Sequence, residues 1–428
     1  MPPTAGRRSD FPALRRRRGR SPVHYLDSAC MSLVPTPVLR AMEEYYRYYP
    51  GCAGRSLHRF SEEVSHRIEA AREGFARFLG TRDPASIVFV RNATEAINLV
   101  GRGLSLRRGD RVLVSDQEHN SNLVLWQRLR AERGVGLDVL ALPDDGSFDL
   151  AALEAALARG VTLVSLFHTS NLDGRSLPVR EIVERAHAHG ARVLLDGCQA
   201  APHVPVDLAR IGADFYALSA HKMLGPTGTG VLAAAPGALD GLAPLIVGGE
   251  TVEWTTLTDH ALRPPPHRFE AGLQNYAGVL GAHAALGYLE AAGRDTLAAH
   301  DRRLNERASA ALRENDRVHV IGPAEPAARP SILAFTLDGV DPNDAALFLD
   351  AGYGVLVRSG RHCVHSWYDR RGLTGNVRAS FYLYNDATDV DALVRGVDEL
   401  LTRTDRPPGP ARPAERRAAR ATRPRRRR

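Results

Sequence analysis

Runs of branched apolar residues alternate with amphipathic helical patterns between about residues 60 and 235. The expected helices, with apolar residues every three or four positions, cover residues 62–79, 94–104, 123–133, 150–158 and 180–189. The expected strands are continuous apolar runs at residues 87–90, 111–114, 137–141, 162–166, 192–195, 215–218 and 230–235. Seven such strands separated by helices predict an α/β fold with a mostly parallel sheet covered on both faces.

The pattern changes after about residue 290 and indicates a smaller α/β domain. Helices are expected over residues 294–314, 343–350 and 390–401, and strand-like segments over 332–335, 353–358 and 376–384. Residues around Tyr25–Ser28 are expected to join this domain or line the cleft. The predicted organisation is a basic tail (1–20), a large domain (21–290), a small C-terminal domain (291–403) and a second basic tail (404–428).

The net charge of +7 is concentrated in the two tails. Residues 1–20 hold seven Arg and one Asp, and residues 406–428 hold ten Arg and one Glu, so removing these +6 and +9 leaves −8 for the body. Both tails are low in apolar residues, and we expect them to be disordered. The C-terminal tail could contact nucleic acid, but a solvated extension is the favoured interpretation.

Cysteine usage and hydropathy give the expected location of the protein. The four cysteines, Cys30, Cys52, Cys198 and Cys363, show neither metal-ligand nor paired spacing. Free thiols fit a reducing cytoplasm. No apolar run approaches the roughly 20 residues of a membrane span, so we expect a cytoplasmic protein with no membrane anchor and no metal site.

Lys222 is the only lysine among the 56 Lys and Arg residues of the chain. Arginine can replace lysine where a positive charge is enough, but it cannot supply a primary amine that loses its proton and forms a Schiff base. Lys222 also follows an apolar strand directly and precedes the glycine-rich stretch 225–230. We therefore favour a Schiff-base lysine over a surface lysine retained by chance.

Polar residues follow the predicted strands, where ligands bind in parallel sheets. Thr94 follows the first strand at the start of a helix, where free amides and a hydroxyl suit a phosphate. His119 follows the second and could stack on an aromatic cofactor and relay protons. Asn171 follows the fourth, and its amide could reach a ring oxygen.

The later strands are followed by residues suited to pyridoxal 5′-phosphate (PLP). Asp196 could pair with a protonated pyridine nitrogen, which makes PLP an electron sink, and Gln199 could orient the phenolic oxygen. Ser219 and His221 offer two phosphate ligands beside Lys222. Each residue alone has an ordinary structural explanation, but their order at successive strand ends predicts a PLP site.

At these residues the chain resembles the class V, fold-type I PLP-dependent enzymes, most closely the group II cysteine desulfurases and selenocysteine lyases. The resemblance extends from Tyr25 to about Leu401 and omits only the tails. The segments that carry it are 92–100, 118–119, 196–200, 219–222, 225–230, 268–272, 357–363 and 377–380.

The resemblance implies a role for each site residue. For the cofactor ring, it implies a covalent link at Lys222, a contact to the pyridine nitrogen at Asp196, a contact to the ring hydroxyl at Gln199 and stacking by His119. For the cofactor phosphate, it implies binding by Thr94, Ser219 and His221. For the substrate, it implies binding by Arg378, Arg358 and Asn171. It also implies a homodimer, in which the partner subunit adds a phosphate contact from just after residues 269–272.

Cys363 distinguishes reactions within this class. In the desulfurases a loop cysteine here takes the sulfur of L-cysteine (or selenium of selenocysteine) as a persulfide, leaves L-alanine, and passes the sulfur to an acceptor protein. A thiolate is a strong nucleophile toward sulfur, and Arg361 and His362 beside Cys363 are expected to favour it. Gly360 is expected to permit loop movement.

Several positions depart from the family pattern and keep alternatives open. Cys30 replaces a small residue and places a second thiol near the cofactor, the segment 364–368 is atypical, and Tyr276 replaces a small hydroxyl residue. The alternatives are another class V activity (a transaminase, an epimerase or a C–S lyase) and a nucleic-acid-binding or scaffold protein with a vestigial PLP fold.

Overall fold

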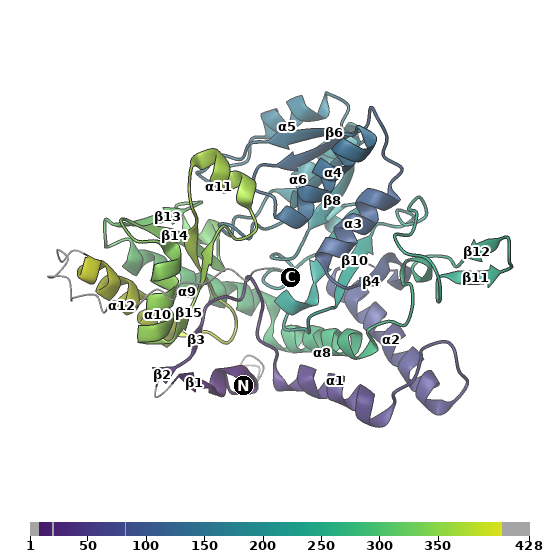
Figure 1. The fold of residues 1–428 in the computed structure, drawn as a ribbon, viewed down its shortest axis with the longest axis horizontal. Coiled ribbons are helices and arrows are strands. Elements are labelled where there is room, and N and C mark those ends of the chain that lie inside the picture. Colours follow the sequence, from purple (N-terminus) through teal and green to yellow (C-terminus); the bar gives the residue numbers. More distant parts are fainter. Residues whose placement is uncertain (1–7, 19–20, 82, 405–428) are drawn as a thin grey trace, which may run out of the picture.

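The computed structural model describes residues 8–18, 21–81 and 83–404. Its large domain contains a seven-stranded sheet with the order β4–β10–β9–β8–β7–β5–β6 (Figure 1). The strands are β4 (Ile87–Val90), β5 (Arg111–Ser115), β6 (Gly136–Leu140), β7 (Leu163–Phe167), β8 (Arg192–Asp196), β9 (Phe215–Ser219) and β10 (Gly230–Ala234). β10 is antiparallel to both of its neighbours, and the other six strands all run in one direction, so the predicted mostly parallel sheet is confirmed.

Helices cover both faces of this sheet. They are α1 (Thr36–Tyr48), α2 (Arg59–Phe78), α3 (Ala93–Gly103), α4 (Val124–Arg133), α5 (Leu150–Leu157), α6 (Val179–Ala188), α7 (Leu208–Ile211) and α8 (Tyr276–Ala292). Successive strand residues point to opposite faces: Leu194 belongs to the core formed with α3 and α4, and Leu195 to the core formed with α2, α5, α6 and α8. Burial on both faces explains the continuous apolar runs in the sequence.

The small domain is a four-stranded antiparallel sheet with the order β13–β14–β17–β16. Its elements are α9 (Arg294–Leu312), β13 (Val318–Ile321), β14 (Ile332–Leu337), α10 (Pro342–Tyr353), β16 (Arg358–Gly360), α11 (His365–Arg371), β17 (Asn376–Ser380) and α12 (Ala387–Thr404). The single strand expected over 353–358 is instead divided. β15 (Val355–Leu356) pairs with β3 (His24–Tyr25), and β16 pairs with β17. β17 is also shorter than expected, because a turn closes between Tyr382 and Asn385.

The N-terminal segment is ordered where we expected disorder, so that prediction is wrong for residues 8–18. Short 3-10 turns (Arg8–Asp10 and Pro12–Arg15) flank Phe11, which is fully buried. The ring of Phe11 packs on Tyr288 and Tyr384, with centroids 5.9 and 4.8 Å apart. One buried aromatic ring outweighs the low overall hydropathy of the segment. Residues 1–7 and the tail from 405 lie outside the described residues.

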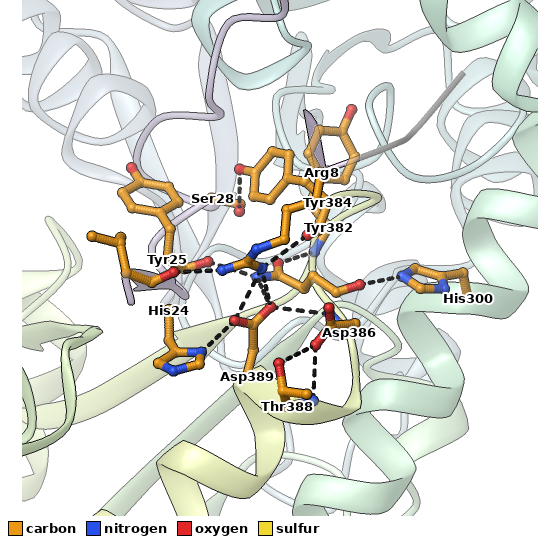
Figure 2. A network of polar contacts seen from close by, with 12 residues as sticks. Arg8, His24, Tyr25, Ser28, His300, Tyr382, Tyr384, Asp386, Thr388 and Asp389 are labelled. Atoms are coloured by element: carbon orange, nitrogen blue, oxygen red, sulfur yellow. Dashed lines mark hydrogen bonds and ion pairs between the residues drawn. The ribbon is translucent and has the colours of Figure 1, made fainter. Parts of the chain in front are cut away.

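Arg8 joins this segment to the small domain, as Figure 2 shows. Its guanidinium donates to the Asp389 carboxylate at 2.9 Å and to the Val23 carbonyl at 2.5 Å. His24 contacts the same carboxylate at 2.6 Å. Tyr384 completes the cluster by hydrogen bonding to Ser28 at 2.7 Å. The cluster therefore fixes the chain that leads to Ala29 and Cys30.

A short hairpin, β11 (Val252–Thr255) and β12 (His260–Leu262), projects from the body (Figure 1). It carries the exposed side chains of Trp254 and Leu257. Among the described residues, no helix is long and apolar enough to cross a membrane.

Candidate active site

All the predicted site residues line one cavity of about 300 Å³ beyond the carboxyl ends of the large sheet. These residues are Thr94, His119, Asn171, Asp196, Gln199, Ser219, His221, Lys222, Arg358, Cys363 and Arg378. Asp196 ends β8, Ser219 ends β9, and Lys222 lies in the single turn that follows. The topology thus brings together, around one cavity, the ends of strands that are far apart in the sequence.

One end of the cavity is suited to a phosphate dianion. The amide of Ala93 donates to the Ser219 hydroxyl at 2.9 Å, and Thr94 Oγ1 lies 2.7 Å from Ser121 Oγ. These residues meet at the N-terminus of α3, where the helix dipole favours negative charge. Burial, and then the charge of Lys222, lower the pKa of His221 to about 4. The imidazole is therefore neutral at physiological pH and can offer a ring N–H.

The middle of the cavity carries the groups expected to hold the pyridine ring. Asp196 Oδ1 accepts the amide of Cys198 at 3.0 Å. Gln199 donates to the Ala29 carbonyl at 2.7 Å, and its Oε1 is buried with no partner among the described residues. Burial is also the main reason that the pKa of His119 falls to about 4. A ring hydroxyl would satisfy the orphaned oxygen of Gln199, so these residues fit PLP.

A tight turn fixes the backbone around Lys222. The carbonyl of His221 accepts the amide of Ser32 at 2.8 Å, and the Ser32 hydroxyl accepts the amide of Leu224 at 2.7 Å. A Cβ on Gly225 would lie 2.9 Å from the Ala220 carbonyl oxygen, so this position requires glycine. The single lysine is thus held at the sheet edge by hydrogen bonds between its turn and the N-terminal segment that contains Ser32.

Two arginines from the small domain form the other end of the cavity. Arg358 and Arg378 are register partners on β16 and β17. Arg378 donates to the Asn171 carbonyl at 2.7 Å and to Asp27 at 3.3 Å, and its buried Nε has no partner among the described residues. Arg358 donates to Cys30 Sγ. Paired guanidinium groups with an unused donor suit a carboxylate.

Cys363 lies on a constrained loop between β16 and α11. His362 and Cys363 have φ values of 47° and 61°, which are unusual for residues with a Cβ. Contacts from the large domain hold both carbonyls: Asn171 Nδ2 donates to His362 at 2.7 Å, and the amide of Asn120 donates to Cys363 at 2.7 Å. The Asn171 amide group thus binds the loop in this structure.

The expected activation of Cys363 by its two preceding residues is wrong. Arg361 is paired with Asp369 at 2.6 Å and does not line the cavity. Burial lowers the pKa of His362 to about 2, so its imidazole is uncharged. The positive charges that line the cavity beside Lys222 are instead those of Arg358 and Arg378.

The sequence reasoning missed Ser121 and Asn92. Ser121 lies between Thr94 and His119, with Oγ 3.0 Å from His119 Nδ1. Asn92 caps α3 by accepting the amide of Glu95 at 3.1 Å. Their signals were present, because Ser121 follows a predicted site histidine by two residues and Asn92 stands at a helix-cap position.

The fold and this site are those of a fold-type I PLP-dependent enzyme. Residues 24–393 match the family model "Aminotransferase class-V", and the chain belongs to this family. A probable cysteine desulfurase from Halobacterium salinarum is 40% identical over 396 residues, which are 92% of this chain and 95% of the relative. A cysteine desulfurase from Klebsiella pneumoniae is 38% identical over 92% of this chain and 97% of its own length.

Solved structures agree with the family match. The apo cysteine desulfurase from Thermococcus onnurineus NA1 superposes with a TM-score of 0.88 at 35% identity, over 92% of this chain and 97% of that chain. The Escherichia coli cysteine desulfurase CsdA, in an S-sulfonic acid form, gives 0.83 at 33% identity over 92% and 98%. The predicted class V, fold-type I architecture is confirmed, and with it PLP as the cofactor of the chain's family.

Proposed function

We propose that this chain is a PLP-dependent cysteine desulfurase that converts L-cysteine to L-alanine and receives the sulfur as a persulfide on Cys363. The observation that carries the proposal is the shared cavity of Lys222, Cys363 and two arginines in a class V chain. An amine, a sulfur nucleophile and a carboxylate clamp are the groups that this reaction needs.

Seven residues would hold the cofactor. Thr94, Ser219 and His221 would bind the phosphate, Asp196 the pyridine nitrogen, Gln199 the ring hydroxyl, His119 the ring face and Lys222 Nζ the aldehyde carbon. When bound, PLP withdraws the negative charge that develops at the substrate Cα.

The remaining residues would bind the substrate and move its protons. Arg378 and Arg358 would clamp the substrate carboxylate, with Asn171 nearby, and so orient Cα toward Lys222. Lys222 Nζ would take up the Cα proton. The His119 imidazole is neutral above about pH 4 and could hold a second proton during the reaction.

Cys363 Sγ would then attack the sulfur of the bound substrate. A bond forms between the two sulfurs, the substrate's carbon–sulfur bond breaks, and a proton from a cavity residue reaches the released carbon. L-Cysteine and a thiol thus become L-alanine and a persulfide, without an outside oxidant or reductant. Selenocysteine would react at the same atoms.

Cys363→Ser is the direct test. We expect alanine formation from L-cysteine to fall by at least about a hundredfold, because serine is a poor nucleophile toward sulfur. Cys52→Ser is the matched control, since Cys52 does not line the cavity. Alanine release by C363S at the wild-type rate would refute the proposal. Pyruvate with sulfide would identify a lyase, and dependence on a keto acid a transaminase.

We also propose a homodimer. Ile246, Val247 and Leu273 are 52%, 58% and 65% exposed. Leu273 directly follows residues 269–272, after which the contact to the partner's phosphate is expected, and Ile246 lines the same surface pocket as Leu273. Leu273→Asp should therefore shift the sedimentation coefficient toward that of a monomer and weaken PLP retention. A monomeric wild-type chain in sedimentation would contradict this proposal.

The destination of the sulfur follows from the same chemistry. The persulfide on partly exposed Cys363 would pass its outer sulfur to a thiol of an acceptor protein.

All four cysteines are free in the structure, which supports a reducing, cytoplasmic location. Nucleic-acid contact through the C-terminal tail concerns residues outside those described.

A further inference from the structure

Three of the four cysteines line the active-site cavity, and the mechanism above uses only Cys363. Cys198 is buried, its thiol donates to Ser219 at 3.6 Å, and burial raises its pKa to about 12. It is therefore an inert packing thiol. Cys30 differs, because it is partly exposed to the cavity and its sulfur accepts a hydrogen bond from Arg358.

The surroundings of Cys30 resemble those of a reactive thiol. The guanidinium group of Arg358 contacts Sγ directly, and reactive cysteines lie in electropositive, partly exposed surroundings of this kind. Arg378 is the register partner of Arg358 across β16 and β17. It lines the same cavity, and its buried Nε has no partner among the described residues. The Nε of Arg378 is therefore a hydrogen-bond donor in the cavity lining that no described residue satisfies.

The backbone holds Cys30 at this place firmly. Its amide donates to the Asp27 carbonyl at 3.0 Å, and the preceding amide of Ala29 donates to Ser380 Oγ at 2.9 Å. Arg358 stands five residues before Cys363, at the start of the strand that leads into its loop. The strand that leads into the persulfide-carrying loop therefore begins at the residue that contacts Cys30.

We propose that Cys30 is a second sulfur carrier, which accepts the sulfane sulfur from the Cys363 persulfide inside the cavity. This inference rests on the proposed function. The Cys30 thiolate attacks the outer sulfur, the bond between that sulfur and Cys363 Sγ breaks, and the electron pair stays on Cys363 Sγ. Cys30 then carries the persulfide and Cys363 is again a thiolate. The step consumes neither oxidant nor reductant.

The relay predicts how many turnovers occur without an acceptor. Cys363 is regenerated once, so wild-type enzyme should form about two equivalents of alanine per chain in a reductant-free burst. Cys30→Ser should form about one, because serine keeps a hydrogen-bond acceptor for Arg358 but cannot carry sulfur. If Cys30 merely positioned Arg358, the serine variant would give the wild-type burst.

Peptide mapping locates the sulfur directly, because the four cysteines fall on four tryptic peptides. Cleavage after arginine gives residues 21–40 for Cys30, 48–55 for Cys52, 193–210 for Cys198 and 362–370 for Cys363. After PLP-loaded enzyme meets L-cysteine and is alkylated, we expect added sulfur on 362–370 first and then on 21–40. The peptides of Cys52 and Cys198 are internal controls.

The outcomes separate the relay from the proposed function. Sulfur on 362–370 that never appears on 21–40, with equal bursts in wild type and C30S, would overturn the relay and leave the desulfurase intact. A disulfide between these two peptides with sulfide release would also overturn it, because attack would then be at the inner sulfur. Sulfur on neither peptide and no alanine would refute the desulfurase itself. In C363S, sulfur on 21–40 would show direct transfer from substrate and exclude the relay order.

Discussion

At the scale of single residues, the role of Lys222 can be tested by exchange for arginine, which is the residue at all other Lys or Arg positions of the chain. Lys222→Arg keeps the positive charge but removes the primary amine. We expect the fold to survive, since Lys222 is only partly buried, and desulfuration to fall at least about a thousandfold. Borohydride treatment should add the cofactor mass to the wild-type chain alone. Covalent labelling of K222R would show that another group holds the cofactor.

The site residues of the large domain were predictable because they lie at or shortly after the carboxyl ends of its strands. Asp196 and Ser219 each end a strand, so the order of strands alone brings them to one edge. The contacts between side chains were less predictable. Asn171 binds the loop carbonyl of His362, and Arg361 turns away to Asp369, because loop backbone geometry decides where these side chains point.

At the scale of elements, one buried carboxylate joins α2 and β4 to the segment before α8. Glu270 receives two hydrogen bonds from Arg72, at 2.8 and 2.9 Å, and a third from the amide of Phe89 at 2.8 Å. Both charged side chains are almost fully buried. The ion pair thus fixes the first strand of the sheet against two other segments.

Glu270→Ala should therefore be strongly destabilising. It leaves the Arg72 guanidinium buried without its partner, and we expect the free energy of unfolding to fall by about 3–5 kcal/mol. Denaturant titration of the PLP-free protein measures this. Glu63→Ala is the control, because Glu63 pairs with Arg67 on an exposed face of α2 and should cost at most about 1 kcal/mol. Equal losses in the two variants would contradict this account of the buried pair.

Helix α11 and the hairpin β11–β12, which the sequence did not predict, lack the periodicity from which helices and strands are predicted. Helix α11 has only seven residues, and its Trp367 and Tyr368 are buried in a small cluster with Leu172. Such a helix exists because of tertiary packing, which local sequence cannot show. The hairpin β11–β12 is largely exposed, so no alternation of buried and exposed residues identified it. The predicted strands β7, β9 and β10, in contrast, are buried along their whole length.

At the scale of the whole molecule, the N-terminal segment connects both domains through Phe11. Its ring lies between Tyr288 of α8 and Tyr384 of the small domain. Phe11→Ala should lower the free energy of unfolding by about 3–5 kcal/mol. Leu347→Ala, at a 68% exposed position on α10, should change it little. A loss in F11A no larger than in L347A, measured by denaturant titration, would contradict packing of this segment in solution.

Asp389 makes the same connection dependent on pH. Burial alone would raise the pKa of Asp389, but the hydrogen bond from His24 and the charge of Arg8 outweigh burial and hold it below its ordinary 3.8. Because the carboxylate binds protons more weakly when folded, its stabilisation is complete above pH 3.8 and is lost as pH falls through the lower folded value.

Asp389→Asn should therefore lower the melting temperature at pH 7 and progressively less as the pH falls below about 4, where the wild type loses the same contact. Asp391→Asn is the control on the same helix, because Asp391 pairs with Arg307 at the surface and its loss should leave the curve nearly unchanged. A wild-type to D389N difference that stays constant from pH 7 to pH 3 would mean that this cluster contributes packing but no charge stabilisation. The positions of Ala29 and Cys30 would then not depend on the ionisation of Asp389.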